Sequence, residues 1–214
     1  GTTWTMNIVH QLRTGGDPDF QDIYHEMPWI ELKEYPGQPN EELLERWKAL
    51  PRDVPRGFKT HAGPGPLLQF REDVRYVVVL RNPEEACVSF KPFVENFNPE
   101  ACKLWGQLDQ WRATYLQDTF EDFYKILLAS FKTPGTSAIP GGLVTRMYWR
   151  FMAGWWPHRN KPNVLFMHFN EMKADHEGSI RKISDFLGFR PTAEQWPMIL
   201  EYTSLPWMKA HPEK

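Results

Sequence analysis

The stretch Arg75-Tyr76-Val77-Val78-Val79-Leu80-Arg81-Asn82-Pro83-Glu84-Glu85 decides the fold of this chain. Its first six residues predict a strand, because a nearly unbroken apolar run is typical of a parallel strand covered on both faces. The residues after it suit the start of a helix, with Asn as the cap, Pro at the first helical position and two acids near the positive end of the helix dipole. A buried strand that passes directly into a helix predicts helices packed on a parallel sheet.

The same alternation continues along the rest of the chain. A second buried strand is predicted at 164–167, and a short strand candidate lies at 57–60. Helices are expected at 4–13, 41–50, 100–131, 143–156 and 178–187, and loops at 17–39 and 132–142. Gly15 and Gly188 are expected to end two of these helices. We therefore predict a single domain over residues 1–214, of α/β class, with a P-loop-type, mostly parallel β-sheet flanked by helices on both faces.

Composition and charge argue against several classes of protein. The 214 residues suit one α/β domain, and 41% of them are hydrophobic, which is enough for a core. With 25 basic and 27 acidic side chains the net charge is −2, so no global field attracts nucleic acid or an anionic membrane. No apolar run reaches the roughly 18 residues of a membrane span. Cys87 and Cys102 form no C-x-x-C motif, which favours a reducing, cytoplasmic location.

The segment Gly1-Thr2-Thr3-Trp4 opens the first expected helix. Free backbone N–H groups and the helix dipole favour phosphate or sulfate at such a place, and two Thr hydroxyls add donors. Without other context, Gly-Thr-Thr before a helix is more often a plain cap. Because a phosphate loop follows a strand, we expect this sequence to be a fragment of a longer domain.

The segment Lys59-Thr60-His61 precedes a turn rich in Gly and Pro at 62–66. Ligands bind at strand ends in α/β sheets, and the ordinary pKa of His lies close enough to neutral pH for a general base. A surface His beside a turn is the commoner meaning of such a segment alone.

Arg81 ends the strongest strand, and Ser89 lies about two turns into the helix that follows. The guanidinium fork suits a phosphate, and the Ser hydroxyl adds a further donor. An Arg after a strand is, by itself, usually a solvated charge.

Taken together and in this order, these segments resemble the cytosolic-type sulfotransferases, which move a sulfuryl group from 3′-phosphoadenosine-5′-phosphosulfate (PAPS) to an acceptor. The most specific local match is 76–90, which is similar to the family's 3′-phosphate motif. The stretches 154–156, 164–173 and 202–209 also resemble family segments. The resemblance places the family's loop Lys before Gly1, and its Arg-Lys-Gly segment and dimer motif beyond Lys214.

The resemblance implies PAPS as donor, PAP as product and no metal, and the histidines show no metal-ligand spacing. It implies that His61 takes the proton of the acceptor hydroxyl and that Lys59 contacts the sulfonate. The positions that it assigns to the nucleotide are Gly1, Thr2, Thr3, Trp4, Arg81, Ser89, Phe169, Thr203, Ser204 and Leu205. Two of them depart from the family, because Phe169 stands for a Tyr and Leu205 for a Phe.

The acceptor is expected to be a small molecule with a hydroxyl, and the ten Trp and fourteen Phe of the chain favour an apolar or aromatic one. Sugar and polyketide hydroxyls remain open. Candidate acceptor-pocket aromatics, for each of which core packing is an equal alternative, are Trp29, Phe90, Phe93, Trp105 and Tyr148. A homodimer is possible and cannot be read from these residues.

Two other functions stay open at this point. A P-loop kinase or NTPase is disfavoured, because Gly1 is followed by Thr-Thr-Trp instead of Gly-Lys-Ser/Thr and because Arg81 stands where a magnesium-binding acid is expected. A non-catalytic nucleotide-binding relative stays open because of the departures at Phe169 and Leu205. His61 and Lys59 argue for an enzyme, since a binding protein has no need of a base.

Overall fold

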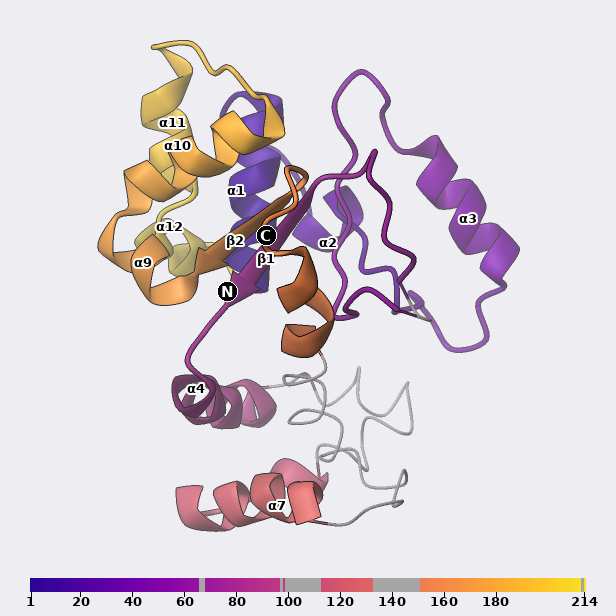
Figure 1. The fold of residues 1–214 in the computed structure, drawn as a ribbon, viewed down its shortest axis with the longest axis vertical. Helices are drawn as coiled ribbons and strands as arrows, with labels where there is room; N and C mark the ends of the chain where they lie inside the picture. Colours follow the sequence, from indigo (N-terminus) through magenta and orange to yellow (C-terminus); the bar gives the residue numbers. More distant parts are fainter. Residues whose placement is uncertain (66–67, 97, 99–112, 133–150, 213) are drawn as a thin grey trace.

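The computed structural model describes residues 1–214 except 66–67, 97, 99–112, 133–150 and 213 (Figure 1). Its sheet contains β1 (Tyr76–Leu80) and β2 (Val164–His168), which pair in parallel. The register runs from Tyr76 opposite Val164 to Leu80 opposite His168. Both strands lie where the apolar runs predicted them, and their parallel pairing confirms the predicted arrangement.

Alternate side chains of the two strands enter two different apolar clusters. Val77 and Val79 pack against the cluster that contains Met167, whereas Val78 belongs to a cluster with Trp155. Successive residues of a strand point to opposite faces. Both faces of the sheet are therefore covered, and this explains why the strand sequences are apolar throughout instead of alternating.

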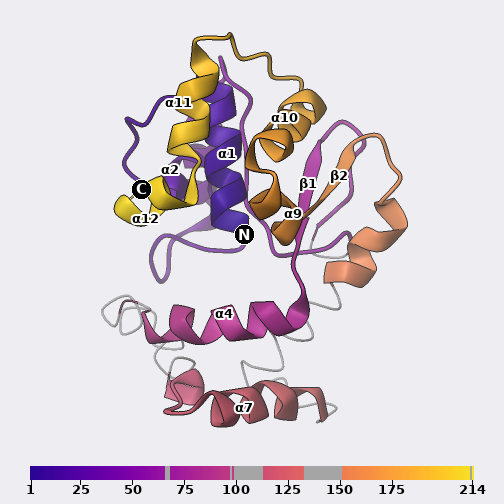
Figure 2. The same ribbon diagram turned by 90° about the vertical axis from the view of Figure 1, so that its left-hand side faces the viewer.

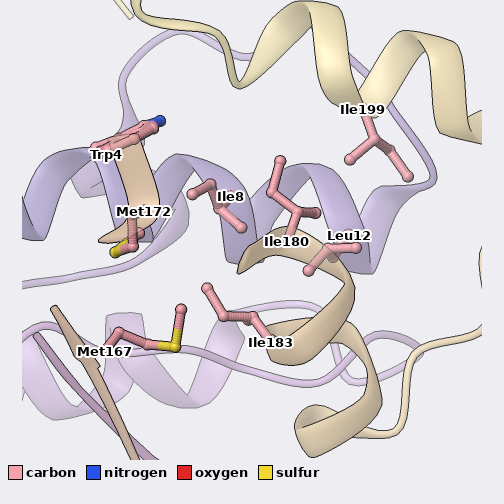
Figure 3. Close-up of a cluster of buried hydrophobic side chains, with 8 residues drawn as sticks. All are labelled: Trp4, Ile8, Leu12, Met167, Met172, Ile180, Ile183 and Ile199. Carbon is pink, nitrogen blue, oxygen red and sulfur yellow. The ribbon is translucent and has the colours of Figure 1, made fainter. Parts of the chain in front are cut away.

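One face of the sheet is covered by helices from both ends of the chain. They are α1 (Thr2–Thr14), α9 (Phe169–Ala174) and α10 (His176–Leu187), and α11 (Gln195–Tyr202) and α12 (Leu205–Ala210) add a further layer on the far side of α1 from the strands (Figure 2). Figure 3 shows the buried side chains that hold them together: Trp4, Ile8, Leu12, Met167, Met172, Ile180, Ile183 and Ile199. The i, i+4 spacing of the first three places them on one side of α1, as the sequence predicted.

Helical residues 151–155 and the short helix η1 (Trp156–His158) pack on the other face through Trp155. The α/β fold with helices on both faces of a parallel sheet is thus confirmed. Gly15, with φ 76°, is the left-handed cap that ends α1, and Gly188, with φ 81°, ends α10 in the same way. Both helix ends agree with the sequence.

Within the described ranges, no helix has the length and apolar character needed to cross a membrane.

α4 (Pro83–Glu95) begins directly after β1, as predicted. The side chain of its cap, Asn82, accepts hydrogen bonds from the N–H groups of Glu84 (2.8 Å) and Glu85 (3.4 Å). α7 (Phe120–Lys132) lies beside α4, and in Figures 1 and 2 the two helices form a separate layer below the rest of the molecule. Val94, Tyr115 and Phe123 are buried between them.

Several expectations for the remaining segments were wrong. The loop expected at 17–39 contains α2 (Ile23–Glu26), which Asp22 caps by accepting a hydrogen bond from the N–H of Tyr24 at 2.7 Å. The strand expected at 57–60 is only an isolated parallel bridge between Trp29 and Lys59. The sequence did not predict α9, α11 or α12. The helix predicted at 41–50 is present as α3 (Asn40–Ala49).

Three expected segments are described only in part or not at all. The loop at 132–142 lies almost wholly outside the described residues. The helical stretch expected at 100–131 is described from residue 113, with helix at 113–115 and in α7, and the helix expected at 143–156 is described from residue 151.

Candidate active site

The site is built around the start of α1, which lies at the carboxyl end of β1 (Figure 1). A β-carbon added at Gly1 would lie 3.2 Å from Phe169 Cδ2 and 3.3 Å from Val79 Cγ1. These distances are tighter than ordinary contacts, so a glycine allows the backbone to approach the strand end closely. Ligand sites at the carboxyl ends of parallel strands are the general rule in open α/β sheets.

The first turn of α1 offers backbone donors. Its cap residue, Gly1, has no side chain, and the first N–H groups of an α-helix lack partners within the helix. The helix dipole adds partial positive charge at the same place. Thr2 is half-buried and Thr3 is exposed, so two hydroxyls accompany these N–H groups. This end of α1 is therefore suited to hold an anion.

Arg81 lies directly after β1, with its Cζ 4.6 Å from the centre of the Phe169 ring. Its Nε is 3.4 Å from Glu85 Oε2, and Asn170 Nδ2 donates to Glu85 Oε1 at 2.9 Å. The hydrogen bond from Asn170 and then that from Arg81 lower the pKa of the Glu85 carboxyl. Phe169 and Asn170 begin α9, so this network joins the end of β1 to the residues that follow β2.

Trp4 is held by residues from the other end of the chain. Its Nε1 donates to the carbonyl oxygen of Thr203 at 2.7 Å, and its ring is stacked on His176, with the centres 5.9 Å apart. The ring of Phe169 meets Trp4 edge-on at 5.7 Å. Thr203 is fully buried, and its Oγ1 lies 3.1 Å from His176 Nε2. Burial lowers the pKa of His176, so its ring is held in the neutral form.

Lys59 is buried although it carries a charge, and its exposed fraction is only 7%. Its Nζ lies 4.0 Å from the centre of the Trp29 ring and donates to the hydroxyl of Tyr24 at 3.0 Å. That hydroxyl lies 3.5 Å from Thr3 Oγ1, so Lys59 is linked to the first turn of α1 through a single side chain. Aromatic rings and one hydroxyl offset part of the cost of burying the ammonium group.

His61 is half-buried, with its ring edge-on to Trp29 at 4.8 Å between the centres. Burial, followed by the positive charge of Lys59, lowers the pKa of His61 to about 4, and the Glu31 carboxylate opposes this effect. The imidazole is therefore neutral near pH 7 and can accept a proton. An acceptor hydroxyl beside this ring would lie next to both a base and an ammonium group.

The structure thus brings most of the sequence-predicted residues into one neighbourhood. Through the contacts above it joins Gly1, Thr3, Trp4, Lys59, His61, Arg81, Phe169 and Thr203, together with the candidate acceptor residue Trp29. Thr2 lies in the same first turn of α1.

The remaining predicted residues that lie within the described ranges do not take part in the contacts above. Ser204 caps α12, because its Oγ accepts a hydrogen bond from the N–H of Trp207 at 3.2 Å, and Leu205 packs against the main core. Ser89 is exposed on α4. Phe90 and Phe93 stack on each other at the α4–α7 layer, with centres 5.8 Å apart. Two further candidates, Trp105 and Tyr148, lie outside the described residues.

Sequence reasoning missed four contributors to this neighbourhood: Tyr24, Glu31, Asn170 and His176. Tyr24 and Glu31 stand in a stretch expected to be loop, and no periodicity or motif singled them out. His176 belongs to no motif and has no metal-ligand spacing, and its role as the stacking partner of Trp4 depends on a contact between distant segments. Within the described ranges, no three His, Cys, Asp or Glu side chains are grouped so that they could hold a metal ion.

Comparison with known protein families matches a sulfotransferase domain over residues 1–214, which is the whole chain. The chain belongs to the sulfotransferase family. The family membership that the motifs predicted is therefore confirmed.

Curated relatives of this sulfotransferase domain are enzymes named for sulfotransfer. Luciferin sulfotransferase of Photinus pyralis is 29% identical over 98% of this chain and 54% of its own length. Sulfotransferase 1C2 of Homo sapiens is 26% identical over 99% of this chain and 63% of its own length. The chain thus spans between 54% and 63% of the length of these two relatives.

Solved structures share the fold of this domain. The mouse sulfotransferase SULT7A1 complexed with PAP superposes with a TM-score of 0.65 at 23% identity, covering 98% of this chain and 62% of that one. Retinol dehydratase in complex with androsterone and PAP gives a TM-score of 0.60 at 23% identity, covering 100% of this chain and 64% of that one. Both likenesses support the P-loop-containing α/β architecture described above.

Proposed function

We propose that this domain transfers a sulfuryl group from PAPS to a hydroxyl of a small, apolar or aromatic acceptor, with His61 as the general base. The observation that carries the proposal is the grouping of neutral His61 and buried Lys59 around Trp29, one hydroxyl away from the donor-rich start of α1. A base, a cation and an anion site in one neighbourhood are what sulfuryl transfer to a hydroxyl requires.

The residues fit a nucleotide with phosphates at both 3′ and 5′ positions. The first turn of α1 offers N–H groups and the hydroxyls of Thr2 and Thr3 to one phosphate, and Gly1 leaves room for close approach. Arg81 offers its guanidinium to the other, with Ser89 as a further donor on α4. Two structures of similar fold carry PAP, which supports the same nucleotide for this chain.

The base of the nucleotide is assigned to the aromatic residues beside the start of α1. Phe169 is half-buried between Arg81 and Trp4, so its ring is well placed to stack on an adenine. Trp4 and Thr203 form the fixed wall behind it, because the indole N–H is held by the buried Thr203 carbonyl. Ser204 and Leu205 follow in the chain and complete the assignment.

The proposed chemistry is an in-line displacement for which bound PAPS supplies the activated sulfuryl group. His61 is neutral near pH 7 and takes the proton from the acceptor hydroxyl. Lys59 Nζ, held by Tyr24 and Trp29, balances negative charge near the transferred group. Trp29 presents an apolar surface beside the base, which favours an apolar or aromatic acceptor. Retinol and androsterone, named with the related retinol dehydratase structures, are small molecules of this kind.

The donor half of the proposal is tested by isothermal titration of this chain with PAP and with ADP, beside Arg81→Ala. PAP should bind more tightly than ADP. Arg81→Ala should lower the affinity for PAP by about 10- to 100-fold, which is the contribution expected of a charge-assisted hydrogen bond. Arg190→Ala removes an exposed arginine from the segment that follows α10 and should leave both affinities unchanged. Equal affinity for PAP and ADP would refute the assignment of Arg81.

The catalytic half is tested by sulfuryl transfer from PAPS to a panel of phenols, steroids and other small alcohols. Turnover without added metal supports the proposal. Tight PAP binding with no turnover on any acceptor would favour a non-catalytic nucleotide-binding relative, and stabilisation by ATP and magnesium in place of PAP would favour a P-loop kinase or NTPase.

We further propose a cytoplasmic location, from the sparse cysteines, which fractionation of the source cells would test.

A further inference from the structure

The carboxylate of Glu31 contacts three consecutive residues of the segment that carries His61. A single oxygen, Glu31 Oε1, accepts hydrogen bonds from the N–H of His61 at 2.8 Å, from the N–H of Ala62 at 3.0 Å and from Thr60 Oγ1. The N–H of Ala62 also donates to Thr60 Oγ1 at 2.9 Å, which closes a small ring of hydrogen bonds. Hydrogen bonds to a carboxylate are shorter and stronger than neutral ones.

Regular secondary structure does not hold this segment in place. Its nearest backbone pairing is the isolated bridge one residue earlier, where the N–H of Lys59 donates to Pro28 O (2.9 Å) and the N–H of Ile30 donates to Lys59 O (3.0 Å). Glu31 extends this bridge by one more step, because its side chain replaces the backbone acceptor that a longer strand would provide. The backbone at His61 is therefore held by the Glu31 side chain, while the ring itself packs against Trp29.

Glu31 also acts on His61 through its charge. The charged side chains that act on the protonation of His61 are Lys59 in its own segment and Glu31 in the neighbouring segment. Burial and the positive charge of Lys59 lower the pKa of His61, and the carboxylate of Glu31 raises it. Without Glu31 the imidazole would be a weaker base as well as a less well-placed one.

We propose that Glu31 is a positioning residue that holds the segment of the general base His61 in place for proton transfer from the acceptor. The inference rests on the proposed function, because it assigns Glu31 a role in that same proton transfer. Glu31 touches the backbone of residues 61 and 62 and the hydroxyl of Thr60, so it acts through His61 and not on the acceptor itself.

The test compares Glu31→Ala and Glu31→Gln with Glu34→Ala. Glu34 is another glutamate of the same segment, paired with Arg46 away from His61, and serves as the matched control. Glu31→Ala should lower kcat by about 10- to 100-fold, since small displacements of a catalytic group have effects of this size. Glu31→Gln keeps an oxygen that can accept all three hydrogen bonds and should recover part of the loss. The kcat of Glu34→Ala should stay within about twofold of the kcat of the protein without substitutions.

Three further readouts separate positioning from general damage. The affinity for PAP, measured by titration, should be unchanged in both Glu31 variants, so the loss lies in kcat. The acid limb of the kcat–pH profile should move to lower pH in Glu31→Gln, because the variant lacks the charge that raises the pKa of His61. Amide NMR signals of His61 and Ala62 should shift in both variants, whether or not an acceptor has been found.

Each outcome decides a different point. An unchanged protein that turns over no acceptor overturns the proposed function and this role together. Active protein whose Glu31→Ala variant matches Glu34→Ala overturns the role of Glu31 alone. Loss of PAP binding in a folded Glu31→Gln variant, or an acid limb that does not move, also overturns it, because Glu31 would then act through something other than His61.

Discussion

Acidification should destabilise this domain through His10, a buried histidine near the middle of α1. Its side chain is 4% exposed, and its ring packs against Phe20 with centres 4.6 Å apart. Arg13 Nη2 lies 3.1 Å from His10 Nδ1, while Glu26 Oε2 lies 3.7 Å away and binds Arg13 at 2.7 Å. Burial, and after it the charge of Arg13, lowers the pKa of His10 to about 4.

The sign follows from comparing the folded and unfolded states. Between pH 6.5 and pH 4 the unfolded chain binds a proton at this histidine, whose ordinary pKa is about 6.5, and the folded chain does not. The free energy of unfolding is therefore highest above about pH 6.5 and falls as the pH drops through this window. Between pH 7 and pH 5 the loss amounts to about 2 kcal/mol for this one group.

The assay is urea unfolding at pH 7 and pH 5, followed by circular dichroism, for the unchanged protein and for His10→Gln. Other groups titrate over the same range, so the informative quantity is the difference between the two proteins in the stability that each loses. It should be about 2 kcal/mol, or about 1 M in the urea midpoint at a typical slope. His25→Gln changes an exposed histidine of α2. Between pH 7 and pH 5, this variant should lose as much unfolding free energy as the protein without substitutions.

Two results would refute the reasoning. If His10→Gln loses stability as steeply as the unchanged protein, His10 is not held neutral by burial. Suppose instead that the protein without substitutions becomes more stable on acidification and the variant does not. The Glu26 carboxylate must then stabilise the protonated ring of His10, and its effect on the pKa of His10 must be larger than those of burial and Arg13.

Two further predictions concern the site. His61→Ala should lower turnover by about 10²- to 10⁴-fold while PAP affinity stays unchanged, and loss of both in a titration would contradict its assignment as the base. Trp4→Phe should cost about 1–3 kcal/mol, because it leaves the buried carbonyl of Thr203 without the donor now 2.7 Å away. Thermal unfolding measures that cost, and an unchanged midpoint would show that the indole hydrogen bond does not contribute to stability.

The elements that the sequence predicted well carry local signals. The apolar runs at 76–80 and 164–168, the Asn82 cap and the glycines that end α1 and α10 can each be recognised within a few residues. The elements that were missed are short helices, although Asp22 caps α2 and Ser204 caps α12. α2 is only four residues long, and α9 begins without a side-chain cap hydrogen bond immediately after β2. The short strand expected at 57–60 has only Trp29 as a bridge partner, and strand formation depends on partners as much as on composition.

The residues of the candidate site divide in the same way. Lys59, His61 and Arg81 could be picked out because their segments follow the order of a known family. The residues that hold them could not be picked out, because Tyr24 and Glu31 stand in an expected loop and Asn170 carried no assigned role in its family-like segment. Tyr24 meets Lys59 across 35 positions, and Asn170 meets Glu85 across 85.

The sequence by itself determined that two strands are buried on both faces, where α4 begins, where α1 and α10 end, and which family the motif order resembles. These properties depend on residue type and spacing over one or two turns of chain, which periodicity and capping express directly. Only the tertiary structure decided that Trp4 is fixed by Thr203, 199 positions away, and that Glu31 holds the segment of His61. Such pairs form because packing the helices against the sheet brings distant segments together. The local sequence around each residue does not specify its distant partner.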